Sequence, residues 1–142
     1  MFDPSRDQVR EAFFEAWRKY RAGEVLAGIE AMIVDVALQH PEYHDVLSDP
    51  ERYRGRDYVD EANPFLHMSL HLALEEQLSI DQPAGIAAAF RRLVSKSTDR
   101  HEALHHALEC LAETVWKSQR DKASPDADAY LRCLEGKKAR LD

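Results

Sequence analysis

Apolar residues recur every three or four positions along most of this chain, which is the spacing of one face of an α-helix. The first such stretch carries Val9, Phe13, Ala16, Trp17 and Tyr20. It should end at Gly23, because glycine commonly follows the last residue of a helix. A second helix is expected from about residue 24 to 39. Pro41 should end it, since proline cannot continue the hydrogen-bond ladder.

The second half of the chain predicts further helices, each with a recognisable start. Asn63-Pro64, Asp99 and Ser124-Pro125 are such starts, because Asn, Asp and Ser side chains cap helices and proline fits the first turn. Another helix is indicated by Ile86, Ala89, Phe90 and Leu93. No stretch alternates as a strand would. The pattern therefore predicts an all-α bundle of five or six helices with short connections.

The pattern also predicts the domain organisation. The 142 residues fit a single domain over 1–142. Residues 41–62 lack a long apolar period, so we expect an extended loop with one short helical turn. Residues 137–142 are expected to form a frayed tail.

Composition and charge narrow the range of functions. The chain is 44% hydrophobic and 32% charged, with a net charge of −7. An acidic chain is not expected to bind nucleic acid, and no apolar run is long enough to cross a membrane. No leader sequence is evident, so we expect a cytoplasmic protein. Cys110 and Cys133 are accordingly expected to be reduced thiols.

Histidines are the chain's most informative residues. Counting helix directions in an up-and-down bundle places all seven histidines near one end. In the third expected helix, His67, His71 and Glu75 are spaced four residues apart, and each step rotates by only about 40°, so they share one side. In the fifth, "RHEALHHALE" holds His101 and His105 with the same spacing.

These histidines suggest a metal site. Two pairs, His67/His71 and His101/His105, could face each other on parallel helices. Imidazoles suit transition metals rather than calcium or magnesium, and zinc or iron is the expected ion. The supplementary ligands or orienting groups would be Glu75 and Glu102. From the loop, His40 and His44 could close the site.

Two better-known metal motifs fit poorly. His101-Glu102-Ala103-Leu104-His105 matches the H-E-x-x-H pattern of zinc proteases. However, the extended motif fails at Leu108 and Leu111, and no strand is present to hold a peptide. Glu102 and His105 form one E-x-x-H unit, but di-iron bundles need two such units and the chain has no second. No catalytic residue can be assigned, so enzymatic activity stays open.

A second class of function competes with metal binding. Buried histidines often serve only packing and hydrogen bonding. The chain would then be a non-enzymatic interaction or structural protein. Apolar surface at Trp17, Tyr20 or Trp116 would favour contacts with a partner or a second copy.

The chain also resembles a known family. The segments MFDPSRDQVREAFFEAWRKYRAGE, HPEYHDVLSDPERY, NPFLHMSLHLALEEQLSIDQP and AYLRCL are similar to a bacterial family of uncharacterised proteins, domain of unknown function 1841. The resemblance covers nearly the whole chain. It implies a small single-domain cytosolic protein and supplies no catalytic residues.

Overall fold

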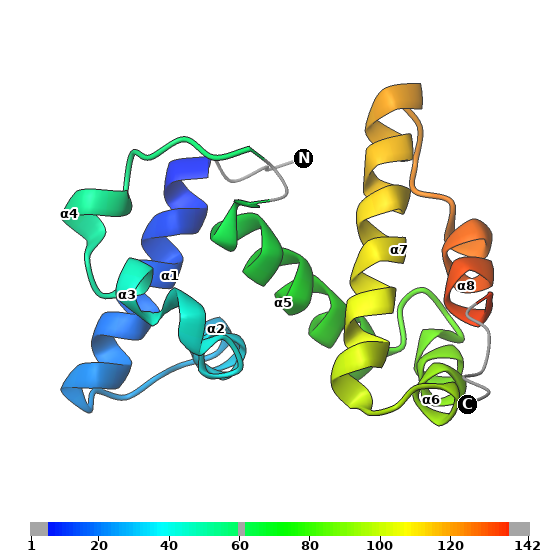
Figure 1. Cartoon of the computed structure of the whole chain (residues 1–142), viewed down its shortest axis with the longest axis horizontal. Helices are drawn as coiled ribbons and strands as arrows, with labels where there is room; N and C mark the ends of the chain where they lie inside the picture. Colours follow the sequence, from blue (N-terminus) through cyan, green and yellow to red (C-terminus); the bar gives the residue numbers. More distant parts are fainter. Residues whose placement is uncertain (1–5, 60–61, 137–142) are drawn as a thin grey trace. The chain divides into compact units, whose positions relative to one another are not determined.

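The fold is helical throughout the part of the chain that is described. The structure is a computed structural model that describes residues 6–59 and 62–136. Within these ranges it contains eight α-helices, one short 3₁₀ helix and no strand (Figure 1). The all-α prediction is confirmed, whereas the predicted five or six helices were too few. The expected frayed tail, 137–142, lies outside the described residues.

The chain divides into two compact units, residues 1–72 and 73–142. The boundary falls within one helix, α5, which spans Pro64–Ile80. The expectation of one domain over 1–142 therefore stays a prediction.

The first unit is built on a pair of packed helices with short helical segments and the first part of α5. Its elements are α1 (Arg6–Ala22), α2 (Ile29–Leu38), η1 (Pro41–Tyr43), α3 (His44–Leu47) and α4 (Pro50–Tyr53). The core takes its buried side chains from α1, α2, α3 and α5, including Phe13, Phe14, Trp17, Val34, Val36, Leu47, Phe65 and Met68. Phe14 and Phe65 meet edge to face, with ring centroids 5.4 Å apart. This packing sets α2 and α5 close enough to share side-chain contacts.

Helix α2 is shorter than the predicted helix over 24–39. It begins at Ile29, directly after Gly28, whose φ is +56°. An L-residue rarely adopts this backbone conformation, whereas glycine does so without penalty. The helical period of the sequence continues through Leu26, but the backbone at Gly28 interrupts the helix.

The segment 41–62 is more helical than the predicted loop with one turn. It holds η1, α3 and α4, and α4 begins at Pro50 with Asp49 as its cap. Arg10 of α1 is fully buried and fixes the end of α4. Its Nη1 donates to the carbonyl oxygens of Arg54 at 3.1 Å and Arg56 at 2.6 Å. These short helices were missed because each is one turn long and has no apolar period of its own.

The second unit contains the remaining helices, α6 (Ile86–Lys96), α7 (Arg100–Asp121) and α8 (Ala127–Glu135), which pack against one another. The predicted cap at Asp99 is confirmed, because its Oδ1 accepts the backbone N–H of Glu102 at 2.9 Å. Helix α8 begins slightly later than predicted, with Asp126 as its cap. The core of this unit is formed by Ile86, Phe90, Leu93, Ala103, Leu104, Ala107, Leu108, Tyr130 and Leu134.

The two cysteines correct one prediction. Cys110 of α7 and Cys133 of α8 form a disulfide, where reduced thiols were expected. Cys110 is buried, because α8 packs against that side of α7. Among the described helices, none is both long and apolar enough to span a membrane.

Candidate metal centre

His40 follows the last turn of α2 and its ring is held in a fixed orientation. Its Nδ1 lies 2.7 Å from the carbonyl oxygen of Val36, so Nδ1 carries the proton and donates. In the neutral ring, Nε2 then keeps its lone pair. The side chain is only 3% exposed. His40 therefore presents a lone pair inside the first unit.

His67 and His71 lie one turn apart on α5, as the sequence predicted. Their ring centroids are 5.8 Å apart. His71 is 1% exposed, whereas His67 is half-buried. Their helix starts at Pro64, where the predicted cap is confirmed: Asn63 Oδ1 accepts the backbone N–H of Phe65 at 2.9 Å.

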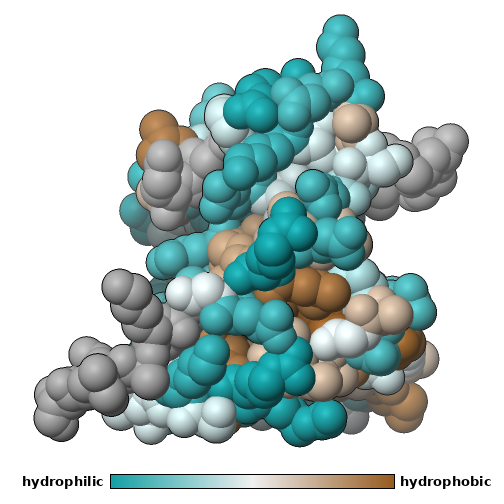
Figure 2. Space-filling view, turned by 90° about the vertical axis from the view of Figure 1, so that its right-hand side faces the viewer, coloured by the Kyte–Doolittle hydropathy of each residue, from teal (hydrophilic) through white to brown (hydrophobic). Residues whose placement is uncertain are grey.

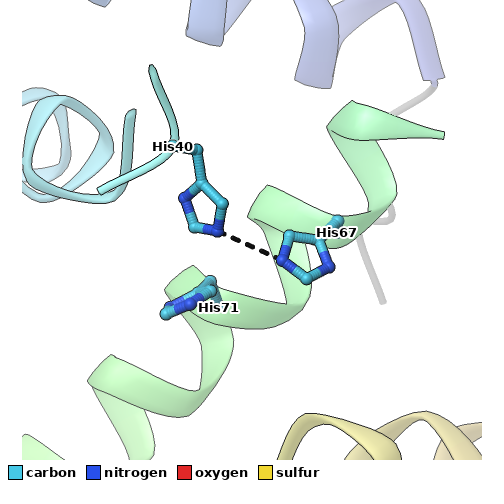
Figure 3. A group of neighbouring side chains, drawn as sticks. All are labelled: His40, His67 and His71. Atoms are coloured by element: carbon cyan, nitrogen blue, oxygen red, sulfur yellow. Dashed lines mark hydrogen bonds between the residues drawn. The ribbon is translucent and has the colours of Figure 1, made fainter. Parts of the chain in front are cut away.

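The three imidazoles converge from two elements (Figure 3). His40 Nε2 lies 3.1 Å from His67 Nε2. The His40 ring also lies against His71, with centroids 4.8 Å apart. One ring nitrogen from each of the three histidines lies within 4.8 Å of the other two. We call His40, His67 and His71 the histidine cluster; its geometry suits a single small cation.

The aromatic ring of Tyr43 lies against the histidine cluster. Tyr43 stacks on His40, with ring centroids 5.5 Å apart and planes 10° apart. Burial, followed by the nearby charge of Glu42, raises the pKa of the Tyr43 phenol. Tyr43 therefore faces the cluster as a neutral, uncharged ring.

His44, the other loop histidine expected at the site, is used elsewhere. Its Nε2 donates to the carbonyl oxygen of Ala37 at 2.8 Å. Its ring lies on the indole of Trp17, with centroids 4.5 Å apart. Of the two histidines in "HPEYH", only His40 joins the cluster.

The remaining expected ligands lie in the second unit. His101 and His105 are exposed, and their rings lie 4.2 Å apart on α7. Glu75 pairs with Arg100 at 3.3 Å, and Glu102 lies in the first turn of α7. Because these residues and the histidine cluster belong to different units, a site shared by both histidine pairs stays a prediction.

His106 also lies on α7, directly after His105. It is half-buried, and its Nε2 donates to the carbonyl oxygen of Cys133 at 3.0 Å. The same nitrogen lies 3.7 Å from Cys110 Sγ. This second group, His106 with Cys110 and Cys133, was missed by the sequence analysis. The spacing His106-x-x-x-Cys110 is the only local signal for it.

Comparison with known proteins gives a family and no activity. A family model described as "Domain of unknown function (DUF1841)" matches residues 5–136, so the chain belongs to that family. Neither a curated protein nor a solved structure matches the chain. The chemistry of the histidine cluster must therefore be argued from its own geometry.

Proposed function

We propose that this member of the DUF1841 family binds a transition metal, zinc or iron, through His40, His67 and His71. The observation that carries the proposal is the convergence of three imidazole nitrogens within 4.8 Å of one another. Two of the three rings are buried, and the third is half-buried. Neutral imidazoles are favoured ligands of zinc, copper, iron and nickel, whereas calcium and magnesium prefer oxygen.

The distances suit a tetrahedral ion. With zinc–nitrogen bonds of the usual length, two imidazole nitrogens on one zinc ion lie about 3.3 Å apart. His40 and His67 already place their Nε2 atoms 3.1 Å apart. One ring nitrogen of His71 lies within 4.8 Å of a ring nitrogen of each of the other two histidines. A closer approach of His71 would therefore complete the set of three nitrogens around one ion.

The hydrogen bond from His40 to Val36 supports this role. Histidine ligands usually donate their second ring N–H to a carbonyl or carboxylate, which fixes the tautomer and the ring plane. His40 Nδ1 does so at 2.7 Å. His67 donates from Nε2 to His40 when no metal is bound, so metal binding moves its proton to Nδ1. This tautomer change is the main cost of loading the site.

Three protein ligands leave one coordination position on a tetrahedral ion. Structural zinc sites are usually closed by four protein ligands, whereas catalytic sites keep a position for water or substrate. The half-buried His67 marks the side from which solvent approaches.

A second candidate function is a structural histidine cluster without metal, in a protein that binds partners. The direct His40–His67 hydrogen bond favours it, because it pairs both rings without an ion. Tyr20 and Trp116 are 42% and 58% exposed, whereas Trp17 is buried. The face drawn in Figure 2 has hydrophobic areas among its hydrophilic residues. Such areas are common on monomers as well, so they favour partner binding only weakly.

Metal titration of the untagged protein tests the proposal. Metal-free protein should bind one equivalent of Co²⁺ with the visible absorption of a tetrahedral ion. His71→Ala should weaken this binding at least tenfold, because it removes a ligand. His44→Ala is the matched control, since His44 lies in the same unit but bonds to Ala37 instead; it should bind as the wild type does.

The same titration contains a second control. His101→Ala should leave Co²⁺ binding unchanged, because the first unit supplies all three proposed protein ligands. Equal binding by the wild type and His71→Ala would contradict metal binding by the histidine cluster and favour the metal-free cluster.

A further inference from the structure

In the second unit, residues whose side chains can bind metal lie around the disulfide. Cys110 on α7 and Cys133 on α8 are 23 positions apart in sequence and have Cα atoms 5.8 Å apart. His106 lies one turn before Cys110, on the same side of α7. The two sulfurs and one ring nitrogen of His106 all lie within 4.8 Å of one another.

The spacing again suits a tetrahedral ion. A thiolate sulfur and an imidazole nitrogen bound to one zinc ion are about 3.6 Å apart. Cys110 Sγ and His106 Nε2 are 3.7 Å apart. When the S–S bond breaks, the two sulfurs separate, and two thiolates on one zinc ion lie about 3.8 Å apart. Reduction thus moves the sulfurs in the direction that a metal site requires.

We propose that reduction of the Cys110–Cys133 disulfide creates a metal site in which both thiolates and His106 bind a zinc-class ion. A dithiol reductant supplies two electrons and two protons: the S–S bond breaks, two thiols form, and the reductant becomes a disulfide. Binding of the divalent ion then releases the two thiol protons to water. No further oxidation or reduction is involved.

The oxidised state is closed to metal for two reasons. Neither sulfur can become a thiolate while the disulfide exists, and thiolate is the form that binds metal. In addition, His106 Nε2 carries a proton and donates it to the Cys133 carbonyl oxygen at 3.0 Å. Metal binding exchanges this hydrogen bond for a coordinate bond, with the proton moved to Nδ1. The oxidation state of the cysteines therefore decides whether a site exists.

A cavity gives reductant and metal a path to the cysteines. A hollow of about 650 Å³ lies between α7 and α8, and Cys110 and Cys133 line it. Cys133 is half-buried, so it is the sulfur more open to attack. Glu113, Asp121 and Asp126 also line the hollow, beside Lys117 and Arg132. Water in this hollow can complete the coordination of the ion.

Cobalt absorption tests the proposal independently of the histidine cluster. The full chain is prepared metal-free in two forms, with the disulfide intact and after dithiothreitol that is then removed under argon. Only the reduced form should show the near-ultraviolet charge-transfer absorption of thiolate bound to Co²⁺. His71→Ala should keep this absorption, because histidine ligands do not produce it.

His106→Ala and His105→Ala form the matched pair for this test. His105 is the neighbouring residue on α7 and is exposed, so its replacement should leave the charge-transfer titration unchanged. Loss of His106 should weaken Co²⁺ binding by the reduced protein at least tenfold. Replacing both cysteines with Ala should abolish the absorption, while circular dichroism reports whether α7 and α8 stay helical.

Two results would overturn the proposal. One is reduced protein without thiolate-to-cobalt absorption, whether it stays folded or loses its helical signal. The other is a charge-transfer absorption that His106→Ala reaches with the same Co²⁺ affinity as the wild type. This would indicate that the two thiolates bind the ion without His106. The last test uses His71→Ala, in which the histidine cluster has lost a ligand. Its reduced form should release Zn²⁺ on reoxidation, measured with a chromogenic chelator, and retention of the ion by the disulfide form of this variant would contradict the dependence on oxidation state.

Discussion

At the scale of single residues, sequence spacing predicted two of the three members of the histidine cluster. His67 and His71 share a side of α5 because four residues are nearly one helical turn. Their partner His40 lies 27 positions before His67, at the end of another helix. A single sequence does not reveal which helices pack together, so His40 could only be suggested beside His44. Only the packing of α2 near α5 distinguishes the two.

The surroundings of Cys110 and His106 were missed for a related reason. The sequence of α7 shows one apolar stripe, formed by Leu104, Leu108, Leu111 and Val115, and neither residue lies on it. Helix α8 covers a second side of α7 and buries Cys110 there. The hydrophobic period of a single helix does not show how many neighbouring helices pack against it.

Tyr130 provides a test of a single buried hydrogen bond. Its hydroxyl donates to Gln77 Oε1 at 2.8 Å, and burial raises the pKa of the phenol above its ordinary value. Tyr130→Phe should lower the free energy of unfolding by about 1 kcal/mol, because the acceptor on Gln77 loses its partner. Urea unfolding measures the change. Tyr20→Phe is the control, since Tyr20 is exposed; an equal loss in both variants would contradict the assignment.

At the scale of helices, start signals were predicted better than lengths. The caps at Asn63 and Asp99 act as expected. Asp49-Pro50 has the same form as Asn63-Pro64 and begins α4, so the sequence does indicate where this short helix starts. The sequence does not indicate its length, because a one-turn helix depends on tertiary contacts, such as those from Arg10, rather than on its own hydrophobic period.

The cap of α5 can be tested directly. Asn63→Ala removes the oxygen that accepts the N–H groups of Phe65 and Leu66. The loss should cost about 1 kcal/mol in the free energy of unfolding. Asn63→Asp keeps an acceptor and should retain the stability. Thermal or urea unfolding of the pair gives the result; equal stability of all three proteins would show that the cap contributes nothing.

The start of α6 should depend on pH through Asp81. Its carboxylate accepts the N–H groups of Ala87 at 2.9 Å and Gly85 at 3.3 Å. The bond from Ala87 has the larger effect and the bond from Gly85 the smaller, and both lower the pKa of Asp81 below its ordinary value near 3.8. A lowered pKa means that the carboxylate stabilises the folded state above pH 3.8. This stabilisation is lost as the pH falls through the folded-state pKa.

Asp81→Asn isolates this contribution, because Asn also tolerates the positive φ of 51° found at this position. The variant should be less stable than the wild type at pH 7. The difference should shrink as the pH falls below 3.8, in urea unfolding at a series of pH values. A difference that does not change with pH would indicate a cause other than the charge.

At the scale of the whole molecule, metal binding is predicted separately for each of the two units. A ligand that binds only the folded state stabilises it by about 2.7 kcal/mol at one hundred times its dissociation constant. If His40, His67 and His71 hold zinc, amide hydrogen exchange should slow in α2 and in the first turns of α5. Unchanged exchange in both segments after zinc is added would contradict binding at the histidine cluster.

The local structure around zinc is the most direct test of the central claim. X-ray absorption on disulfide-intact protein loaded with one equivalent of zinc reports the ligand atoms and their distances. We expect nitrogen or oxygen neighbours at about 2.0–2.1 Å, with the outer-shell scattering of three imidazoles and no sulfur. His71→Ala should lose one imidazole from this pattern. A spectrum without imidazole scattering, or the same spectrum from wild type and His71→Ala, would contradict metal binding by the histidine cluster.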